Sequence, residues 1–237
     1  MAGGPHPEPL AARLEALRSQ LPAATRLLAV SKGQPAEAIR AAVAAGQRSF
    51  GESRLQEAVG KQAQLQDLGP LDWHFIGRLQ ANKARGVMRH FATIHSVDSP
   101  ELAERLQRIA AEENLSPAIL FQVKLAPDPA KTGFDPELLR QVWPRLSRLE
   151  PLRPVGLMTI APLGLDRQER LALFGRCRDL AADLGLGELS MGMSGDWPEA
   201  VEAGSTWVRL GGGLFGPRPA SAGTETGMDT AAKACTG

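Results

Sequence analysis

The order of apolar segments along residues 26–216 is the feature that most constrains the fold. Short apolar runs typical of buried strands alternate with longer segments whose apolar residues recur at helical spacing. This alternation predicts a parallel sheet, because each helix carries the chain back to the start of the next strand. The predicted strands are 26–32, 49–53, 71–77, 93–97, 118–125, 154–160, 188–192 and 206–211.

Eight such units predict an α/β fold, a single (β/α)8 TIM barrel with an additional N-terminal helix at about 8–20. A doubly wound open sheet is the alternative, but no G-x-G-x-x-G turn follows the first strand. Pro144 is expected to kink or shorten the helix at 136–149. The barrel domain is expected to span 1–218, and the small polar residues 219–237 are expected to form a disordered tail.

Charge and hydropathy argue against several classes of protein. The formal net charge is +1, so no broad basic surface favours nucleic acid. No apolar stretch approaches the roughly 20 residues that span a bilayer, and the first residues lack the pattern of a secretory signal. The two cysteines, Cys177 and Cys235, do not suggest a disulfide framework. We therefore expect a cytoplasmic protein without a membrane partner.

Polar residues follow several predicted strands, at the ends that face the functional mouth of a barrel. Lys32 ends the first strand, and a lysine amine partly removed from water loses preference for its charged form. A neutral amine can attack an aldehyde and form a Schiff base. A solvated lysine at a strand–helix junction is the alternative. The other strand-end residues are Glu52, Ser53, His74, His95, Ser96, Lys124, Met158, Ser190 and Arg209.

Three consecutive glycines, Gly211 to Gly213, follow the eighth predicted strand. Their backbone N–H groups are unobstructed, and barrels frequently bind phosphate after strands seven and eight. Ser190 and Ser194, after strand seven, offer either hydroxyl donors or helix caps. A phosphate site is therefore predicted in this part of the mouth, with a flexible turn as the alternative.

Arg209 is expected to point into the same mouth, where a buried guanidinium needs a partner. An ion pair with a carboxylate such as Glu52 is one alternative for it. His74 and His95 lack the spacing of metal motifs, so hydrogen-bonded histidines are favoured over zinc ligands and no metal site is predicted. The H-E-x-x-H and G-x-S-x-G motifs of zinc and serine hydrolases are absent from the sequence.

Several short segments, in the correct order over roughly residues 10–218, resemble the YggS/PROSC family of pyridoxal phosphate homeostasis proteins. They are AVSK (29–32), FGES with QE (50–57), WHFIG with LQANKA (73–84), HSVD (95–98), GLMTI (156–160), LSMGMSGD (189–196) and GSTWVRLG with LFG (204–216). The sequence is most similar to cyanobacterial members. The resemblance implies a barrel like the N-terminal domain of alanine racemase.

The resemblance also implies that pyridoxal 5′-phosphate (PLP) is held as a Schiff base on Lys32. The other residues at cofactor-binding positions are Ser53, His74, Met158, Ser190, Ser194, Arg209, Gly211 and Gly212. Of these, the serines at 190 and 194 and the glycine backbone would hold the phosphate. Arg209 would lie against the pyridine nitrogen, and the remaining three would line the cofactor. Lys131 corresponds to a family lysine associated with cofactor handling near the surface.

Two residues depart from the pattern of the family. Many members have threonine in place of Gly212, so one phosphate-binding hydroxyl is missing here. The loss of such a hydrogen bond costs about 1–3 kcal/mol, which weakens binding without abolishing it. Many members also have asparagine in place of Ser53, so the reach to the ring is shorter.

Two classes of function are compatible with such a site: a racemase-like enzyme acting on amino acids, and a carrier that binds and releases PLP without turnover. An arginine at the ring nitrogen only donates, which makes PLP a weak electron sink, although alanine racemase shares this arginine. That racemase takes a second acid/base, a tyrosine, from an added domain of its partner subunit, and this sequence has no tyrosine.

A carrier in vitamin B6 homeostasis, with no catalytic residue, is therefore the favoured function. A Schiff-base aldolase without a cofactor would leave the glycine loop unexplained. The expected partners are PLP, amino acids that exchange with Lys32 by transimination, and PLP-dependent recipient enzymes. A monomer or weak dimer is expected.

Overall fold

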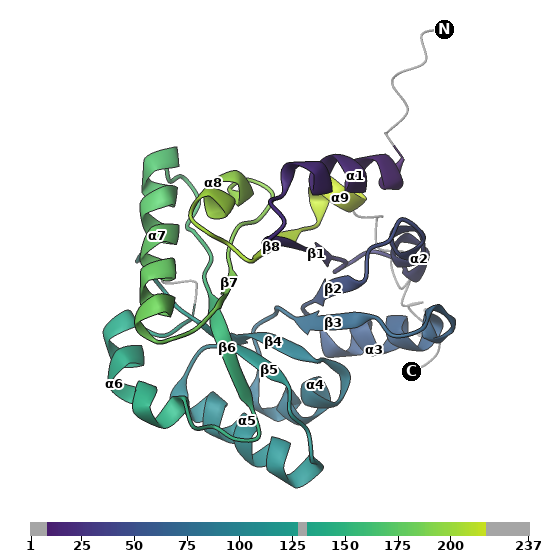
Figure 1. Ribbon diagram of the computed structural model, residues 1–237. Helices are drawn as coiled ribbons and strands as arrows, with labels where there is room; N and C mark the ends of the chain where they lie inside the picture. Colours follow the sequence, from purple (N-terminus) through teal and green to yellow (C-terminus); the bar gives the residue numbers. More distant parts are fainter. Residues whose placement is uncertain (1–8, 128–131, 217–237) are drawn as a thin grey trace, which may run out of the picture.

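Eight parallel strands close in chain order into a barrel, with β8 hydrogen-bonded to β1 (Figure 1). The computed structural model describes residues 9–127 and 132–216. The strands are β1 (Arg26–Val30), β2 (Ser49–Glu52), β3 (Asp72–Phe75), β4 (Thr93–Val97), β5 (Ala118–Gln122), β6 (Arg153–Met158), β7 (Glu188–Ser190) and β8 (Trp207–Leu210). The predicted TIM barrel is confirmed, whereas the predicted tail and Lys131 lie outside the described residues.

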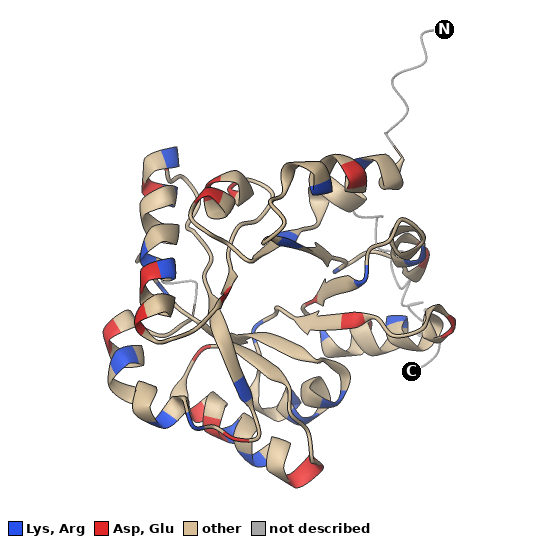
Figure 2. Ribbon diagram, in the orientation of Figure 1, with Lys and Arg blue, Asp and Glu red and all other residues tan. Residues whose placement is uncertain are grey.

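The helices form a layer around the outside of the barrel (Figure 1). They are α1 (Leu10–Gln20), α2 (Ala36–Ala44), α3 (Leu55–Gln64), α4 (Ala84–His90), α5 (Pro100–Glu113), α6 (Pro136–Leu146), α7 (Arg167–Asp183), α8 (Trp197–Glu202) and α9 (Gly212–Phe215), with short 3-10 turns η1 (Gln66–Leu68) and η2 (Ala81–Lys83). Within the described ranges, no helix is long and apolar enough to cross a membrane. Acidic and basic residues are interspersed over these helices in Figure 2.

Local signals in the sequence place several helix ends. Asp135 caps α6 by accepting hydrogen bonds from the N–H groups of Glu137 and Leu138, and Pro136 suits the first turn. Asp166 and Glu169 form a capping box that starts α7. Pro144 lies inside α6, which ends two residues later, so this helix is shorter than predicted. This position near the helix end limits the hydrogen bonding that proline removes.

Side chains alternate between the inside of the barrel and the layer beneath the helices. Phe121 of β5 packs edge-on against Trp143 of α6, with ring centroids 5.9 Å apart. Inside the barrel, a Cβ placed on Gly51 would lie 3.1 Å from Ile76 Cδ1 and 3.2 Å from Leu28 Cδ2.

Gly156 allows β6 and β7 to approach closely, because a Cβ at this position would lie 2.0 Å from the Glu188 carbonyl oxygen. Gly156→Ala is expected to lower the free energy of unfolding by about 1–3 kcal/mol, the usual effect of overpacking. Urea denaturation measures this loss. Gly175→Ala in α7 is the matched control, since a Cβ there meets nothing within 4 Å. It is expected to stabilise the helix by up to about 1 kcal/mol; equal stability of the two variants would contradict the close approach.

Candidate functional site

Lys32 lies immediately after β1, at the mouth formed by the carboxyl ends of the strands. Its side chain is half-buried. Among the described residues, no hydrogen bond or ion pair engages its ammonium group. The structure therefore places a partly desolvated amine without a protein partner where the sequence predicts a nucleophile.

The backbone on the two sides of Lys32 is held by helix α3. Lys61 Nζ donates to the Ser31 carbonyl oxygen at 2.8 Å. Glu57 Oε1 accepts a hydrogen bond from the Gly33 N–H at 2.5 Å and lies 2.6 Å from Lys61 Nζ. Both residues that flank Lys32 are thus fixed, which limits the freedom of the segment that carries the amine.

Glu52 does not face the mouth, as the sequence prediction placed it, but points towards α3. Its fully buried carboxylate accepts hydrogen bonds at 2.7 Å from both Lys61 Nζ and Ser31 Oγ. Burial raises the pKa of Glu52 above its ordinary value, although the hydrogen bonds from Lys61 and Ser31 oppose the shift. The alternative that Glu52 pairs with Arg209 is therefore wrong. Glu52 belongs to the support beneath Lys32.

Arg209 of β8 is buried and is held by oxygens without charge. Its Nη1 donates to the Ser190 carbonyl oxygen at 2.5 Å and to Ser190 Oγ at 2.7 Å, and its Nη2 donates to the Thr159 carbonyl oxygen at 2.9 Å. Burial lowers the pKa of Arg209 to about 10, so the guanidinium stays charged at neutral pH. No carboxylate in the described chain hydrogen-bonds to it, and its Nε–H has no acceptor there.

His74 and His95 are hydrogen-bonded to each other, as the sequence analysis favoured. His74 Nδ1 lies 2.8 Å from His95 Nε2, and His74 Nε2 lies 2.7 Å from Asp72 Oδ2. The His74 ring also meets the Trp207 ring edge-on, with centroids 4.8 Å apart. Both ring nitrogens of His74 are therefore occupied. Within the described ranges, no group of three His, Cys, Asp or Glu residues is arranged to hold a metal ion.

The glycine loop after β8 lies against the end of β1. A Cβ on Gly211 would lie 3.0 Å from the Val30 carbonyl oxygen, so only glycine fits this approach without displacement. At Gly212 and Gly213, a Cβ would meet nothing within 4 Å. The loop continues as the short helix α9, a helix that was not predicted, and Arg13 Nε of α1 donates to the Leu214 carbonyl oxygen at 2.7 Å. The N-terminal helix thus braces the loop beside Lys32.

The N–H groups of Gly212 and Gly213 have no acceptor among the described residues, as is usual for the first turn of a helix. Ser194 is exposed in the turn after the neighbouring strand β7, and its hydroxyl group has no partner in the same part of the chain. These donors belong to the loops after β7 and β8, where the phosphate site is predicted.

Ser190 is placed differently from these donors. Its hydroxyl is fully buried, with Oγ 2.8 Å from His95 Nδ1 and 2.7 Å from Arg209 Nη1. This geometry favours a link between His95 and Arg209 over the contact with phosphate that the resemblance implies. Thr159 and Asp72, which hold Arg209 and His74, were missed in the sequence analysis. The position of Asp72 two residues before His74, on the same face of a strand, was the available signal.

The two remaining predicted lining residues lie near the carboxyl ends of their strands. Met158 ends β6, is 1% exposed and pairs in register with Ser190. Ser53 is half-buried directly after β2. A Cβ on Gly77 would lie 2.3 Å from the Ser53 carbonyl oxygen, so the chain after β3 packs closely on this residue.

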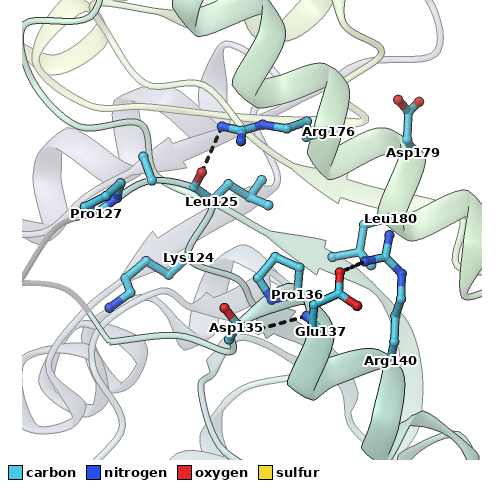
Figure 3. Close-up of a pocket in the computed structure, with 11 residues that line it drawn as sticks. Lys124, Leu125, Pro127, Asp135, Pro136, Glu137, Arg140, Arg176, Asp179 and Leu180 are labelled. Carbon is cyan, nitrogen blue, oxygen red and sulfur yellow. Dashed lines mark hydrogen bonds and ion pairs between the residues drawn. The ribbon is translucent and has the colours of Figure 1, made fainter.

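A pocket of about 640 Å³ lies outside this mouth, between the segment after β5 and the helices α6 and α7 (Figure 3). Arg176 Nη2 donates to the Leu125 carbonyl oxygen at its edge, at 2.8 Å. Lys124, one of the strand-end residues, lines this pocket and is exposed. None of the residues predicted to bind the cofactor lines this pocket, so it is separate from the predicted Lys32 site.

Comparisons with known proteins agree on one relationship. The sequence profile described as the alanine racemase N-terminal domain matches residues 6–219. A pyridoxal phosphate homeostasis protein of Synechocystis sp. is 50% identical over 204 residues, which are 84% of this chain and 94% of that protein. The structure of PipY from Synechococcus elongatus with PLP bound is 56% identical, with a TM-score of 0.84, and the match covers 87% of this chain and all of PipY.

Alanine racemase of Clostridium difficile shares only its fold with this chain. It is 16% identical, with a TM-score of 0.71, and the match covers 90% of this chain but 57% of the racemase.

Proposed function

This chain belongs to the family of pyridoxal phosphate homeostasis proteins, and on that premise we propose that it carries PLP on Lys32 without catalytic turnover. PLP supplies an aldehyde, a phosphate and a pyridine nitrogen. The Lys32 amine condenses with the aldehyde, forming a C=N bond and releasing one water molecule. An incoming amine then displaces Lys32 by transimination and takes the cofactor away, which restores the free amine.

The observation that carries this proposal is the contact between two segments far apart in sequence. Gly211 lies against Val30, two residues before Lys32, where a Cβ would approach the Val30 carbonyl oxygen to 3.0 Å. An amine without a partner and a loop of bare backbone amides are thereby brought to one side of the mouth. Such a pair suits a ligand that has both an aldehyde and a phosphate.

The phosphate is proposed to bind the backbone N–H groups of the glycine loop, from Gly211 onwards, and the Ser194 hydroxyl. Arg209 is proposed to donate to the pyridine nitrogen, and Ser53, His74 and Met158 to line the ring. A cationic donor that never gives up its proton keeps the ring nitrogen unprotonated. This supports binding over carbanion chemistry, because an unprotonated ring is a weaker electron sink.

The distribution of acid/base groups also supports a carrier. A racemase needs a second group that delivers a proton opposite the lysine, and this sequence has no tyrosine. Within the described chain, His95 is linked to Arg209 through Ser190, but it is fully buried and hydrogen-bonded at both ring nitrogens. Burial holds the pKa of His95 well below its ordinary value, so it is poorly suited to deliver this proton. Racemase-like turnover of amino acids is the second candidate function, favoured only by the shared fold.

Borohydride reduction followed by peptide mass mapping tests the site. Borohydride adds hydrogen across the C=N bond, so the expected product is one pyridoxyl group per chain, on the peptide that contains Lys32. Lys83 of η2, which is exposed, serves as an internal reference and is expected to stay unmodified at equimolar PLP. Modification of another lysine in place of Lys32 would overturn the assignment.

Incubation of the PLP-loaded protein with a panel of L-amino acids separates the two candidate functions. A carrier is expected to release PLP to the amine while the configuration of the amino acid is unchanged. Racemisation or decarboxylation at enzymatic rates, of order 1 per second or faster, would replace the carrier function by the enzyme function. The proposal further holds that the barrel domain, residues 1–218, acts in the cytoplasm as a monomer or weak dimer and supplies PLP-dependent enzymes.

A further inference from the structure

A continuous line of side-chain hydrogen bonds crosses the barrel interior from Arg209 to Asp72. It runs from Arg209 Nη1 to Ser190 Oγ (2.7 Å), His95 Nδ1 (2.8 Å), and then from His95 Nε2 to His74 Nδ1 (2.8 Å) and from His74 Nε2 to Asp72 Oδ2 (2.7 Å). Arg209 and the three inner residues are buried, whereas the Asp72 side chain is 42% exposed at the start of β3. The line therefore joins the mouth to solvent at the opposite end of the barrel.

The two ends of this line fix the direction of the hydrogen bonds next to them. Arg209 only donates, so Ser190 Oγ accepts, and the Ser190 proton points to the other polar neighbour of Oγ, His95 Nδ1. Burial raises the pKa of Asp72, but the hydrogen bonds from His74 and Ser49 and the nearby positive charge of Arg26 together outweigh it. The net shift is downward, so the carboxylate is ionised and only accepts. His74 must then carry its proton on Nε2.

The middle hydrogen bond follows from the charge of His95. Burial, followed by the electrostatic effects of His74, Arg209 and Arg26, lowers the pKa of His95 well below its ordinary value, so this ring holds a single proton. Because Nδ1 accepts from Ser190, the proton lies on Nε2 and is donated to His74 Nδ1. All four hydrogen bonds therefore run in one direction, from the cation to the carboxylate.

We propose that Ser190, His95, His74 and Asp72 are positioning residues that fix the Arg209 guanidinium through this one-directional line. Its link to the cofactor rests on the proposed function, because Arg209 is there the donor to the pyridine nitrogen.

Nitrogen-15 NMR of histidine side chains, on the protein without PLP, tests the line directly. At neutral pH both His74 and His95 are expected to show an unprotonated Nδ1 and a protonated Nε2. A proton on Nδ1 of either ring at neutral pH would overturn the proposal.

Two substitutions at Asp72 separate positioning from packing. Asp72→Asn keeps an oxygen that accepts from His74 Nε2, and is expected to preserve both tautomers and PLP affinity within about twofold. Asp72→Leu removes the acceptor, and is expected to mix the tautomers and weaken PLP binding several-fold, measured by absorbance titration. Equal PLP affinity in Asp72→Leu and the wild type would show that the line does not position Arg209. Pyridoxyl mapping to a residue other than Lys32 would instead refute the proposed function, with the tautomers unaffected.

Discussion

Lys32→Ala is expected to abolish covalent binding of PLP while the protein stays folded. The amine is the proposed nucleophile, and it makes no hydrogen bond or ion pair in the described part of the chain, so its removal leaves no buried group unsatisfied. The free energy of unfolding is expected to change by no more than about 0.5 kcal/mol, as for an ordinary surface substitution. The measurements are the Schiff-base absorbance band and the intact mass after borohydride reduction.

Two further variants sharpen this result. Lys83→Ala removes an exposed lysine of η2 and is expected to bind PLP like the wild type. Lys32→Arg keeps the charge and length but replaces the amine by a guanidinium, which stays protonated and does not form the imine. Full covalent labelling of either Lys32 variant would show that another lysine holds the aldehyde. Lys61 is a poor substitute, because its Nζ has three hydrogen-bond partners.

The fold could be predicted because its strongest determinant is local. Apolar runs such as 93–97 are bounded by turn residues, and each one became a strand of the closed barrel. The helix α9 could not be predicted in the same way, since Gly212 and Gly213 have the poorest helix propensity apart from proline. Its last turn is held by tertiary contact with α1, through Arg13 and the Leu214 carbonyl oxygen.

The site could be predicted only where strand order alone places a residue. Lys32 and the glycine loop follow β1 and β8, which are neighbours in any closed barrel, so their proximity follows from topology. Topology does not predict the direction of the Glu52 side chain. A shift of one residue at the end of a strand moves a side chain from the inside of the barrel to the outside. Contact between His95 and Ser190, 95 positions apart, depends on side-chain packing across the barrel and has no signature in periodicity.

Lys61→Met is expected to lower the free energy of unfolding by about 3–5 kcal/mol, the effect of leaving one member of a buried ion pair without its partner. Glu52 is fully buried, and its Oε2 already has no hydrogen-bond partner. The loss of Lys61 leaves Ser31 Oγ as the single donor to this carboxylate. Urea denaturation at pH 7 measures the loss. Arg40→Met, which breaks the exposed ion pair with Asp67, is the control and is expected to leave the free energy of unfolding close to that of the wild type.

The pH dependence of this loss identifies its cause. Burial already raises the pKa of Glu52 above 4.5, and Lys61 is the main group that opposes the shift, so the pKa rises further in Lys61→Met. A raised carboxyl pKa means that the folded state binds the proton more tightly than the unfolded state. Stability relative to the wild type is therefore retained below about pH 4.5 and is lost as the pH rises through the folded pKa of Glu52.

Adding the substitution Glu52→Gln to Lys61→Met completes the test. This double variant has no charge left at the buried Glu52–Lys61 pair. Much of the lost stability is therefore expected to return, and the pH dependence of the loss to disappear. If Lys61→Met lost the same free energy of unfolding at pH 4 as at pH 7, Lys61 would stabilise the protein through packing and not through its charge. The same double variant separates stability from function: it lacks the hydrogen bond to the Ser31 carbonyl oxygen, so slower condensation at Lys32 in a stable protein would show that α3 orients the amine.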